Sequence, residues 1–252
     1  MKRLLSISIV GIMLFALVAC NKTNIQDSQD INKLFMSSVA GKDMVMAKKA
    51  LSKGADINYQ NKDGISALMM ASGVMGDNSI VKELIKAGAD IHQQDNKGNT
   101  PLLHASLYGR NDVIETLLKA GADVNEMPNV NTPLMYASVK GHADTVKLLL
   151  KKGASVNQHS SAGTALIAAS LGNYAEIVKI LIDAGADVNA TDRRGATALI
   201  YAVARNHVDT AKVLLEAGAD KTYKDKLGNS AQSIANDTCN NKERKEMLNL
   251  FK

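Results

Sequence analysis

Residues 100–125 read TPLLHASLYGRNDVIETLLKAGADVN. Thr100 can cap a helix, and Pro101 suits the first turn of that helix. After a reversal at Gly109, a second apolar stretch places its valine, isoleucine and leucines at i, i+1, i+4 and i+5, which is one face of a helix. Gly121 then supplies the left-handed conformation that commonly ends a helix. The segment therefore predicts two short helices joined by a tight turn.

The tripeptide that ends this unit recurs along the chain at a nearly constant spacing. The tripeptide Gly-Ala-Asp, or Gly-Ala-Ser in one case, begins at Gly54, Gly88, Gly121, Gly153, Gly185 and Gly218. Successive glycines lie 34, 33, 32, 32 and 33 residues apart. Gly141, Asn173 and Asn206 take the place of Gly109 in later units, and glycine and asparagine tolerate the left-handed conformation that a reversal needs. A period near 33 is typical of a solenoid, in which each unit buries its apolar face only against its neighbours. Such a stack presents a long surface and offers no obvious deep cleft for catalysis.

The Thr-Pro-Leu start, the Val-Ile and Leu-Leu pairs and the Gly-Ala-Asp-Val-Asn end of residues 100–125 closely resemble the ankyrin repeat. The resemblance covers residues 30–252, with about six repeats and a degenerate seventh. It implies an all-α ankyrin-repeat solenoid of stacked helix-turn-helix units with hairpin-like β-turn loops. The expected repeats span about 31–60, 61–94, 95–127, 128–158, 159–191 and 192–224, with a C-terminal cap at 225–252.

Two departures from the family pattern concern the loops. The His of the family's Thr-Pro-Leu-His is replaced by apolar residues at Met69, Leu103, Met135, Ile167 and Ile200. We expect apolar contacts there, in place of the hydrogen bonds that this His usually makes between neighbouring loops. The turns at 128–131 and 160–163 are one residue short, which predicts an altered loop geometry in those two repeats.

The N-terminus predicts a secretory leader. Lys2 and Arg3 precede an apolar run over residues 4–19, which is short for a membrane-spanning helix of about 20 residues. The run ends in the string LVAC at residues 17–20, which resembles the bacterial lipobox. The resemblance implies a signal peptide at 1–19, then a lipidated Cys20 and a polar tether that reaches residue 30. An ordinary signal peptide or an uncleaved anchor, with an incidental cysteine, is the alternative.

A lipid on Cys20 would place the protein in a bacterial cell envelope, anchored to a membrane and facing the periplasm. The diacylglyceryl group supplies the two acyl chains, for example palmitate, that stable attachment needs. By resemblance to envelope lipoproteins, Asn21 slightly favours the outer over the inner membrane. Removal of Lys2 and Arg3 with the leader reduces the formal net charge from +5 to +3, with 28 basic and 25 acidic residues. This balance is too mild to imply nucleic acid as a partner.

Residues that could carry chemistry have a simpler interpretation. The five histidines show no metal-ligand spacing, and we expect neither a metal site nor a cofactor. The aspartates of the Gly-Ala-Asp motifs follow helix-ending glycines, which is typical of residues that form turns by bonding local backbone. Phosphate-binding loops and nucleophile motifs are lacking. Cys239 is the thiol left after lipidation of Cys20, and an unpaired thiol is favoured there over a disulfide to another chain.

In ankyrin repeats the partner is met by the turn tips and by the exposed side of the first helix, which together form the concave face. Carried onto this sequence, the expected contact residues are Met70, Lys97, His104, Tyr108, Tyr136, Lys140, Arg193, Arg194, Tyr201 and Arg205. Tyrosine and arginine are enriched in the energetically dominant positions of protein interfaces. The alternative is that the turns are polar because they are solvated, and that the tyrosines only pack against their neighbours.

These inferences together predict a membrane-anchored, non-enzymatic module that binds, protects or positions another protein. Since some periplasmic ankyrin-type lipoproteins resemble immunity proteins, neutralisation of a secreted toxin is the alternative. An enzyme with an unrecognised site is the weakest alternative, and no small-molecule substrate is expected.

Overall fold

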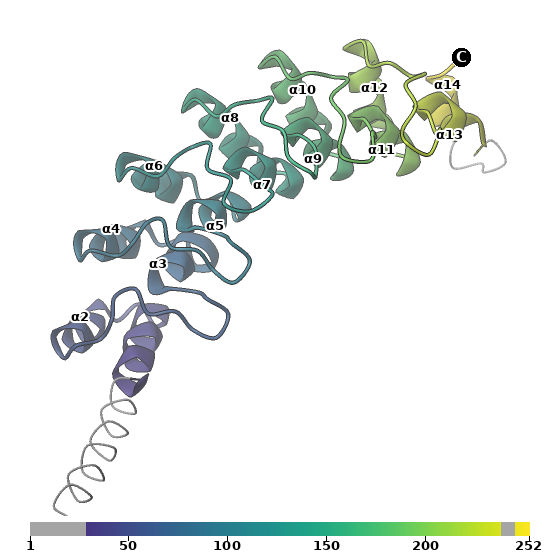
Figure 1. Ribbon diagram of the computed structural model, residues 1–252. Coiled ribbons are helices and arrows are strands. Elements are labelled where there is room, and N and C mark those ends of the chain that lie inside the picture. The colour runs from purple at the N-terminus through teal and green to yellow at the C-terminus, as the bar shows by residue number, and fades with distance from the viewer. Residues whose placement is uncertain (1–28, 238–244) are drawn as a thin grey trace, which may run out of the picture.

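The computed structural model describes residues 29–237 and 245–252. In this part of the chain, helices follow one another in antiparallel pairs that stack into a curved solenoid (Figure 1). The first helices of the pairs are residues 29–40, α3 (Ala67–Met70), α5 (Pro101–Leu107), α7 (Pro133–Lys140), α9 (Ala165–Leu171), α11 (Ala198–Ala204) and α13 (Ala231–Asp237). The second helices are α2 (Met44–Ser52), α4 (Asn78–Lys86), α6 (Asn111–Lys119), α8 (Ala143–Lys151), α10 (Ala175–Asp183), α12 (Val208–Glu216) and α14 (Lys245–Asn249).

The expectation of an all-α solenoid is confirmed. Within the described ranges the loops form isolated β-bridges, such as the one between Gln60 and Ser66, and no β-strand. The helix α3 continues directly into a π-helical turn, η1 (Ala71–Met75). In residues 29–237 and 245–252, no helix combines the length and the apolar character that crossing a membrane requires. Cys20 and Cys239 both lie outside the described residues.

Each of the first helices from α3 to α11 begins where a hydroxyl side chain caps it. The side-chain oxygens of Ser66, Thr100, Thr132, Thr164 and Thr197 accept a hydrogen bond from the backbone N–H three residues further on. Such a cap contributes about 1 kcal/mol to the stability of a helix. The predicted role of the threonines before Pro101 and Pro133 is thus confirmed, and both prolines lie in the first helical turn.

The reversal between the two helices of a pair uses the residue types that tolerate a left-handed backbone. The φ angles are 66° at Gly109, 78° at Gly141, 61° at Asn173 and 59° at Asn206, as the sequence predicts for these turns. A tight reversal at this point lets the second helix fold back along the first. The two helices can then bury their apolar faces against each other and against the next pair.

The core runs between the two layers of helices. The first helices supply the buried leucines Leu68, Leu102, Leu134, Leu166 and Leu199. The second helices supply Leu84, Leu117, Leu149, Leu181 and Leu214. The apolar residues that replace the family's histidine, among them Leu103 and Ile167, are also buried. This position of the repeat therefore makes apolar contacts, as expected. At the C-terminal end α14 packs on α12 and α13, and it buries Met247 there.

Hydrogen bonds link the loop of one repeat to the next. The side-chain oxygens of Asn58, Asn125, Asn157 and Asn189 accept the backbone N–H of the residue after Gly-Ala in the following repeat, at 2.7–2.8 Å. The aspartates of the Gly-Ala-Asp motifs accept the N–H two residues further on, for example Asp90 from His92 at 2.8 Å. These aspartates are therefore turn-forming residues, as predicted from their position after a glycine.

The short turns have the altered geometry that the sequence predicts. In full-length turns the N–H of the first residue donates to the carbonyl oxygen four residues on, as Asp95 does to Asn99 and Asp192 does to Ala196. In the turn at 160–163, Ser160 instead donates to the carbonyl oxygen of Gly163, three residues on. In the turn at 128–131, the N–H of Asn131 bonds the side chain of Asn129.

Candidate functional site

The first helices and the loops that precede them form the inner side of the curved stack, and the second helices lie along its outer side (Figure 1). We call the inner side the concave face. The contact residues predicted from the sequence all belong to these first helices, to the residues that end them, or to these loops. The exposed ones are Lys97, Tyr108, Lys140, Arg193, Arg194 and Arg205. The partly buried ones are Met70, His104, Tyr136 and Tyr201.

His104 connects its helix to the turn of the same repeat. Its Nε2 atom shares a hydrogen bond of 2.9 Å with Oδ2 of the buried Asp95. The Asp95 carboxylate also accepts the backbone N–H groups of Asn99 and Lys97, each at 2.8 Å. Burial alone would raise the pKa of Asp95, but these hydrogen bonds outweigh it and hold the pKa below its ordinary value. Asp95 therefore remains ionised and fixes the turn against α5.

Tyr136 connects its helix to the turn of the preceding repeat. Its hydroxyl group donates to Oδ1 of the buried Asn99 at 2.7 Å, and the side-chain amide of Asn129 donates to the same oxygen at 2.8 Å. The Tyr136 hydroxyl also accepts a longer hydrogen bond, of 3.5 Å, from the side-chain amide of Asn129 in the short turn of its own repeat. Tyr136 thus joins two repeats on the concave face.

Tyr201 repeats the arrangement of His104 further along the stack. Its hydroxyl group donates to Oδ2 of Asp192 at 2.6 Å, and Asp192 also accepts the N–H groups of Arg194 and Ala196. Burial and the neighbouring Asp192 carboxylate raise the pKa of Tyr201 above its ordinary value. For Asp192, burial is outweighed by these hydrogen bonds, and the pKa of its carboxyl is lowered.

Sequence reasoning missed these helix-to-turn contacts. The signal was a spacing of nine residues from a turn aspartate to a polar ring on the following helix, from Asp95 to His104 and from Asp192 to Tyr201. For both rings, and for Tyr136, the hydrogen bonds establish a structural role. Binding of a partner by the same side chains stays a prediction.

Three adjoining hollows lie along the C-terminal half of the concave face. The first, of about 200 Å³, includes Tyr136, Ala162, Ala168 and Leu171 in its lining. The second, of about 460 Å³, shares Ala162 and Leu171 with the first and adds residues of the next repeat. The third, of about 590 Å³, shares Arg193, Arg194 and Tyr201 with the second and extends to Asp225, Leu227 and Ile234. Because neighbouring hollows share lining residues, they form one continuous depression, which we call the C-terminal groove.

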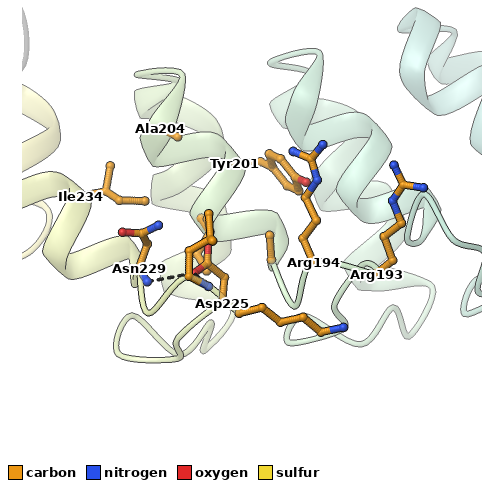
Figure 2. Close-up of a pocket in the computed structure, with 11 residues that line it drawn as sticks. Arg193, Arg194, Tyr201, Ala204, Asp225, Asn229 and Ile234 are labelled. Atoms are coloured by element: carbon orange, nitrogen blue, oxygen red, sulfur yellow. Dashed lines mark hydrogen bonds between the residues drawn. The ribbon is translucent and has the colours of Figure 1, made fainter.

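Figure 2 shows the third hollow, at the end of the C-terminal groove. Ile234 and Ala204 lie on one side of this hollow, and the side chains of Arg193 and Arg194 extend from the loop before α11 on the other side (Figure 2). Leu227, at the tip of the following loop, is 84% exposed. An apolar floor edged by guanidinium groups is suited to a ligand that is itself partly apolar and partly anionic.

The sequence did not identify the apolar part of this hollow. Leu227 occupies the turn-tip position that Lys97 and Arg194 hold in other repeats, and this exception was the available signal. Ala204 occupies the helix position that Leu107, Val139 and Leu171 hold elsewhere. A smaller side chain at that position leaves space between α11 and α13. The hollow therefore results from a small side chain at one helix position, and no sequence motif marks such a position.

Glu126 is a titratable group with a strongly shifted pKa. Burial raises the pKa of its carboxyl to about 7, against the opposing effect of a hydrogen bond from the Thr100 hydroxyl. Thr100 is the residue that caps α5, so we assign Glu126 to the support of that cap. Within residues 29–237 and 245–252, no cluster of histidine, cysteine, aspartate or glutamate side chains is arranged to hold a metal ion.

Comparison with known proteins agrees with this architecture. The family model described as ankyrin repeats (3 copies) matches residues 34–128, 68–160 and 134–225. The chain therefore belongs to the ankyrin repeat family. Ankyrin repeats are a protein–protein interaction module, and proteins of this kind are typically non-catalytic.

Two solved structures illustrate the similarity in fold. The human ASB11 ankyrin repeat domain is 23% identical with a TM-score of 0.76, over 86% of this chain and 96% of that one. The ankyrin repeat domain of Bcl-3, a member of the IkappaB protein family, is 24% identical with a TM-score of 0.68, over 80% and 92% of the two chains. No curated protein matches the chain.

Proposed function

We propose that the protein is a lipid-anchored ankyrin-repeat lipoprotein of the bacterial envelope that binds, protects or positions a partner protein in the periplasm. The concave face makes the contact. The single observation that carries this proposal is the C-terminal groove, which combines an exposed apolar floor with the exposed side chains of Arg193 and Arg194. Apolar surface that is open to solvent and edged by polar groups is typical of protein-binding sites.

Attachment to the membrane is the part of the proposal that rests on the N-terminal sequence. The string LVAC at residues 17–20, behind a basic and apolar leader, supports lipidation of Cys20, and Asn21 favours the outer membrane. The structure has residues 29–40 as a helix, so the predicted tether is two residues shorter, and residues 21–28 can span up to about 28 Å when fully extended. This length lets the concave face meet a partner away from the membrane surface.

We expect Cys20→Ser to abolish lipid attachment and processing of the leader, because the thioether requires this sulfur. Mass spectrometry of the membrane fraction should show a wild-type chain that begins at Cys20 and carries acyl chains, and a Cys20→Ser chain that retains its leader. Cys239→Ser is the matched control, since it removes the second of the two cysteines of the chain and should leave acylation unchanged. Acylation of the Cys20→Ser variant would refute the lipoprotein proposal.

Binding through the concave face predicts a difference between two triple variants. In the inner variant, the exposed residues Lys140, Arg193 and Arg194 are replaced by Ala. In the outer variant, the exposed residues Lys151, Lys179 and Lys212, on second helices, are replaced by Ala. Both variants lose three positive charges from exposed positions, so a general electrostatic effect is the same in each.

The measurement is capture of the partner from envelope extract by the full chain in detergent, followed by titration. The inner variant should weaken the complex about tenfold or more, and the outer variant less than about twofold, because a few central residues carry most interface energy. Equal weakening by both variants would argue for non-specific attraction. Loss of binding in the outer variant alone would place the interface on the second helices.

A further inference from the structure

Two residues at the edge of the third hollow, one on a helix and one at a loop tip, differ from their counterparts in the repeat at 95–127. Ala204, in the last turn of α11, stands where α5 and α9 have leucine, and it is exposed. Leu227, at a loop tip, lines the same hollow, together with Ala196, Ile200 and Ile234. The resulting volume of about 590 Å³ is lined mainly by apolar side chains and is large enough for side chains of a partner. Burial of one leucine or phenylalanine side chain contributes about 1.5–3 kcal/mol.

Three cations, Arg193, Arg194 and Lys226, and one carboxylate, Asp225, line this hollow. In the described part of the chain, Arg193, Arg194 and Lys226 are exposed, and none of them forms an ion pair. Several lysines elsewhere are paired between repeats, among them Lys48 with Glu83 at 2.6 Å and Lys147 with Glu176 at 3.1 Å.

The carboxylates that line the groove offset only part of its positive charge, because four cations, Arg193, Arg194, Arg205 and Lys226, line it together with two carboxylates, Asp192 and Asp225. Asp192 accepts the hydroxyl group of Tyr201 and the N–H groups of Arg194 and Ala196. Asp225 accepts the N–H groups of Leu227 and Asn229 at 2.9 and 2.8 Å. A ligand that carries carboxylate groups would therefore complement the edge of the groove in charge.

The shape of the groove favours an extended chain over a compact ligand. The three hollows follow one another from Tyr136 on α7 to Ile234 on α13, which is three steps along the stack. Neighbouring helices pack about 8–10 Å apart, so the steps together cover roughly 30 Å. An extended segment of about nine residues has this length.

We propose that the C-terminal groove binds an extended segment of a partner protein, in which aspartate or glutamate residues flank an apolar side chain. The apolar side chain enters the hollow between α11 and α13, and the carboxylates lie against Arg193, Arg194 and Lys226. This inference rests on the proposed function and specifies the chemistry of the partner.

The test uses a displayed library of random 12-residue peptides, selected on the full chain in detergent. Selected peptides should carry Asp or Glu within two or three residues of Leu, Ile, Phe or Trp. A synthetic copy of a selected peptide should bind about tenfold or more tightly than its version with the apolar residue replaced by Ser. Its binding should also weaken as the salt concentration rises.

Variants of the protein then test whether the selected peptide binds in the C-terminal groove. Ala204→Leu fills the hollow with the residue that α5 and α9 have there, and Leu227→Ser removes an apolar side chain that is 84% exposed. Each should weaken the selected peptide about fivefold or more, and Arg193→Gln/Arg194→Gln about tenfold or more. Lys179→Gln/Lys212→Gln, on the second helices, is the matched control and should change binding less than twofold. Urea unfolding verifies that each variant remains folded.

The inference is overturned if no peptide is enriched, if the enriched peptides are basic, or if Ala204→Leu, Leu227→Ser and the arginine variant all bind a selected peptide normally. Partner capture by the same chain distinguishes this failure from failure of the proposed function. If a partner is captured through the concave face while the peptide results are negative, the partner presents a folded surface instead of an extended segment. If neither peptide nor partner is bound, the proposed function fails as well.

Discussion

Leu117→Ala is expected to lower the free energy of unfolding by about 2–5 kcal/mol. Leu117 lies on α6 with 0% exposure, in the stripe where the second helices bury one leucine per repeat. Its removal opens a cavity in a core that each repeat shares with its neighbours, and a repeat stack depends on those interfaces. Urea unfolding of the wild type and the variant measures the loss.

Leu118→Ala is the control for this prediction, because it removes the same atoms from the neighbouring position on α6. Leu118 is only partly buried, so its replacement should cost less than that of Leu117. If Leu117→Ala costs less than about 0.5 kcal/mol, or if Leu118→Ala costs more, the assignment of the buried face of α6 is wrong.

Gly64→Ala is expected to cost about 2–5 kcal/mol, for two reasons that add. Gly64 is buried in the turn before α3 at a φ of +76°, where a residue with a Cβ atom is strained by about 1–2 kcal/mol. That Cβ would also lie 2.5 Å from the backbone nitrogen of Asn96 in the next repeat. To relieve this contact, the backbone of Asn96, whose N–H donates to the carbonyl oxygen of Asp63, must move. Such a shift typically adds about 1–3 kcal/mol to the loss of stability.

Gly88→Ala separates the two reasons. Gly88 has a φ of +93°, but no atom lies within 4 Å of the position its Cβ would take. Its replacement should therefore cost only the backbone strain, about 1–2 kcal/mol. Equal losses in urea unfolding for Gly64→Ala and Gly88→Ala would mean that the turns of neighbouring repeats are not in close contact.

Local rules on the sequence were enough to predict the repeating unit. The caps at Thr100 and Thr132, the left-handed turns at Asn173 and Asn206, and the short turn at 160–163 each follow from neighbouring residues in the chain, and the structure has them as expected. The period then arranges these units into a stack without any further information. Fold and core were therefore predictable from one sequence.

The groove was less predictable because it depends on several repeats together. The sequence suggested Arg193, Arg194 and Tyr201 as surface residues, and it did not suggest that Asp192 holds the hydroxyl group of Tyr201. Ala204 contributes to the hollow through its small side chain, which lines the same space as a loop more than twenty residues further along the chain. Such effects become visible only when neighbouring repeats are placed side by side.

Photo-crosslinking of the captured partner shows whether the concave face binds a protein. A benzophenone amino acid replaces either Arg193, which lines the C-terminal groove, or Lys212, which is exposed on the second helix α12. We expect a covalent product with the partner from position 193 and none from position 212. A product from position 212 and none from position 193 would contradict this expectation.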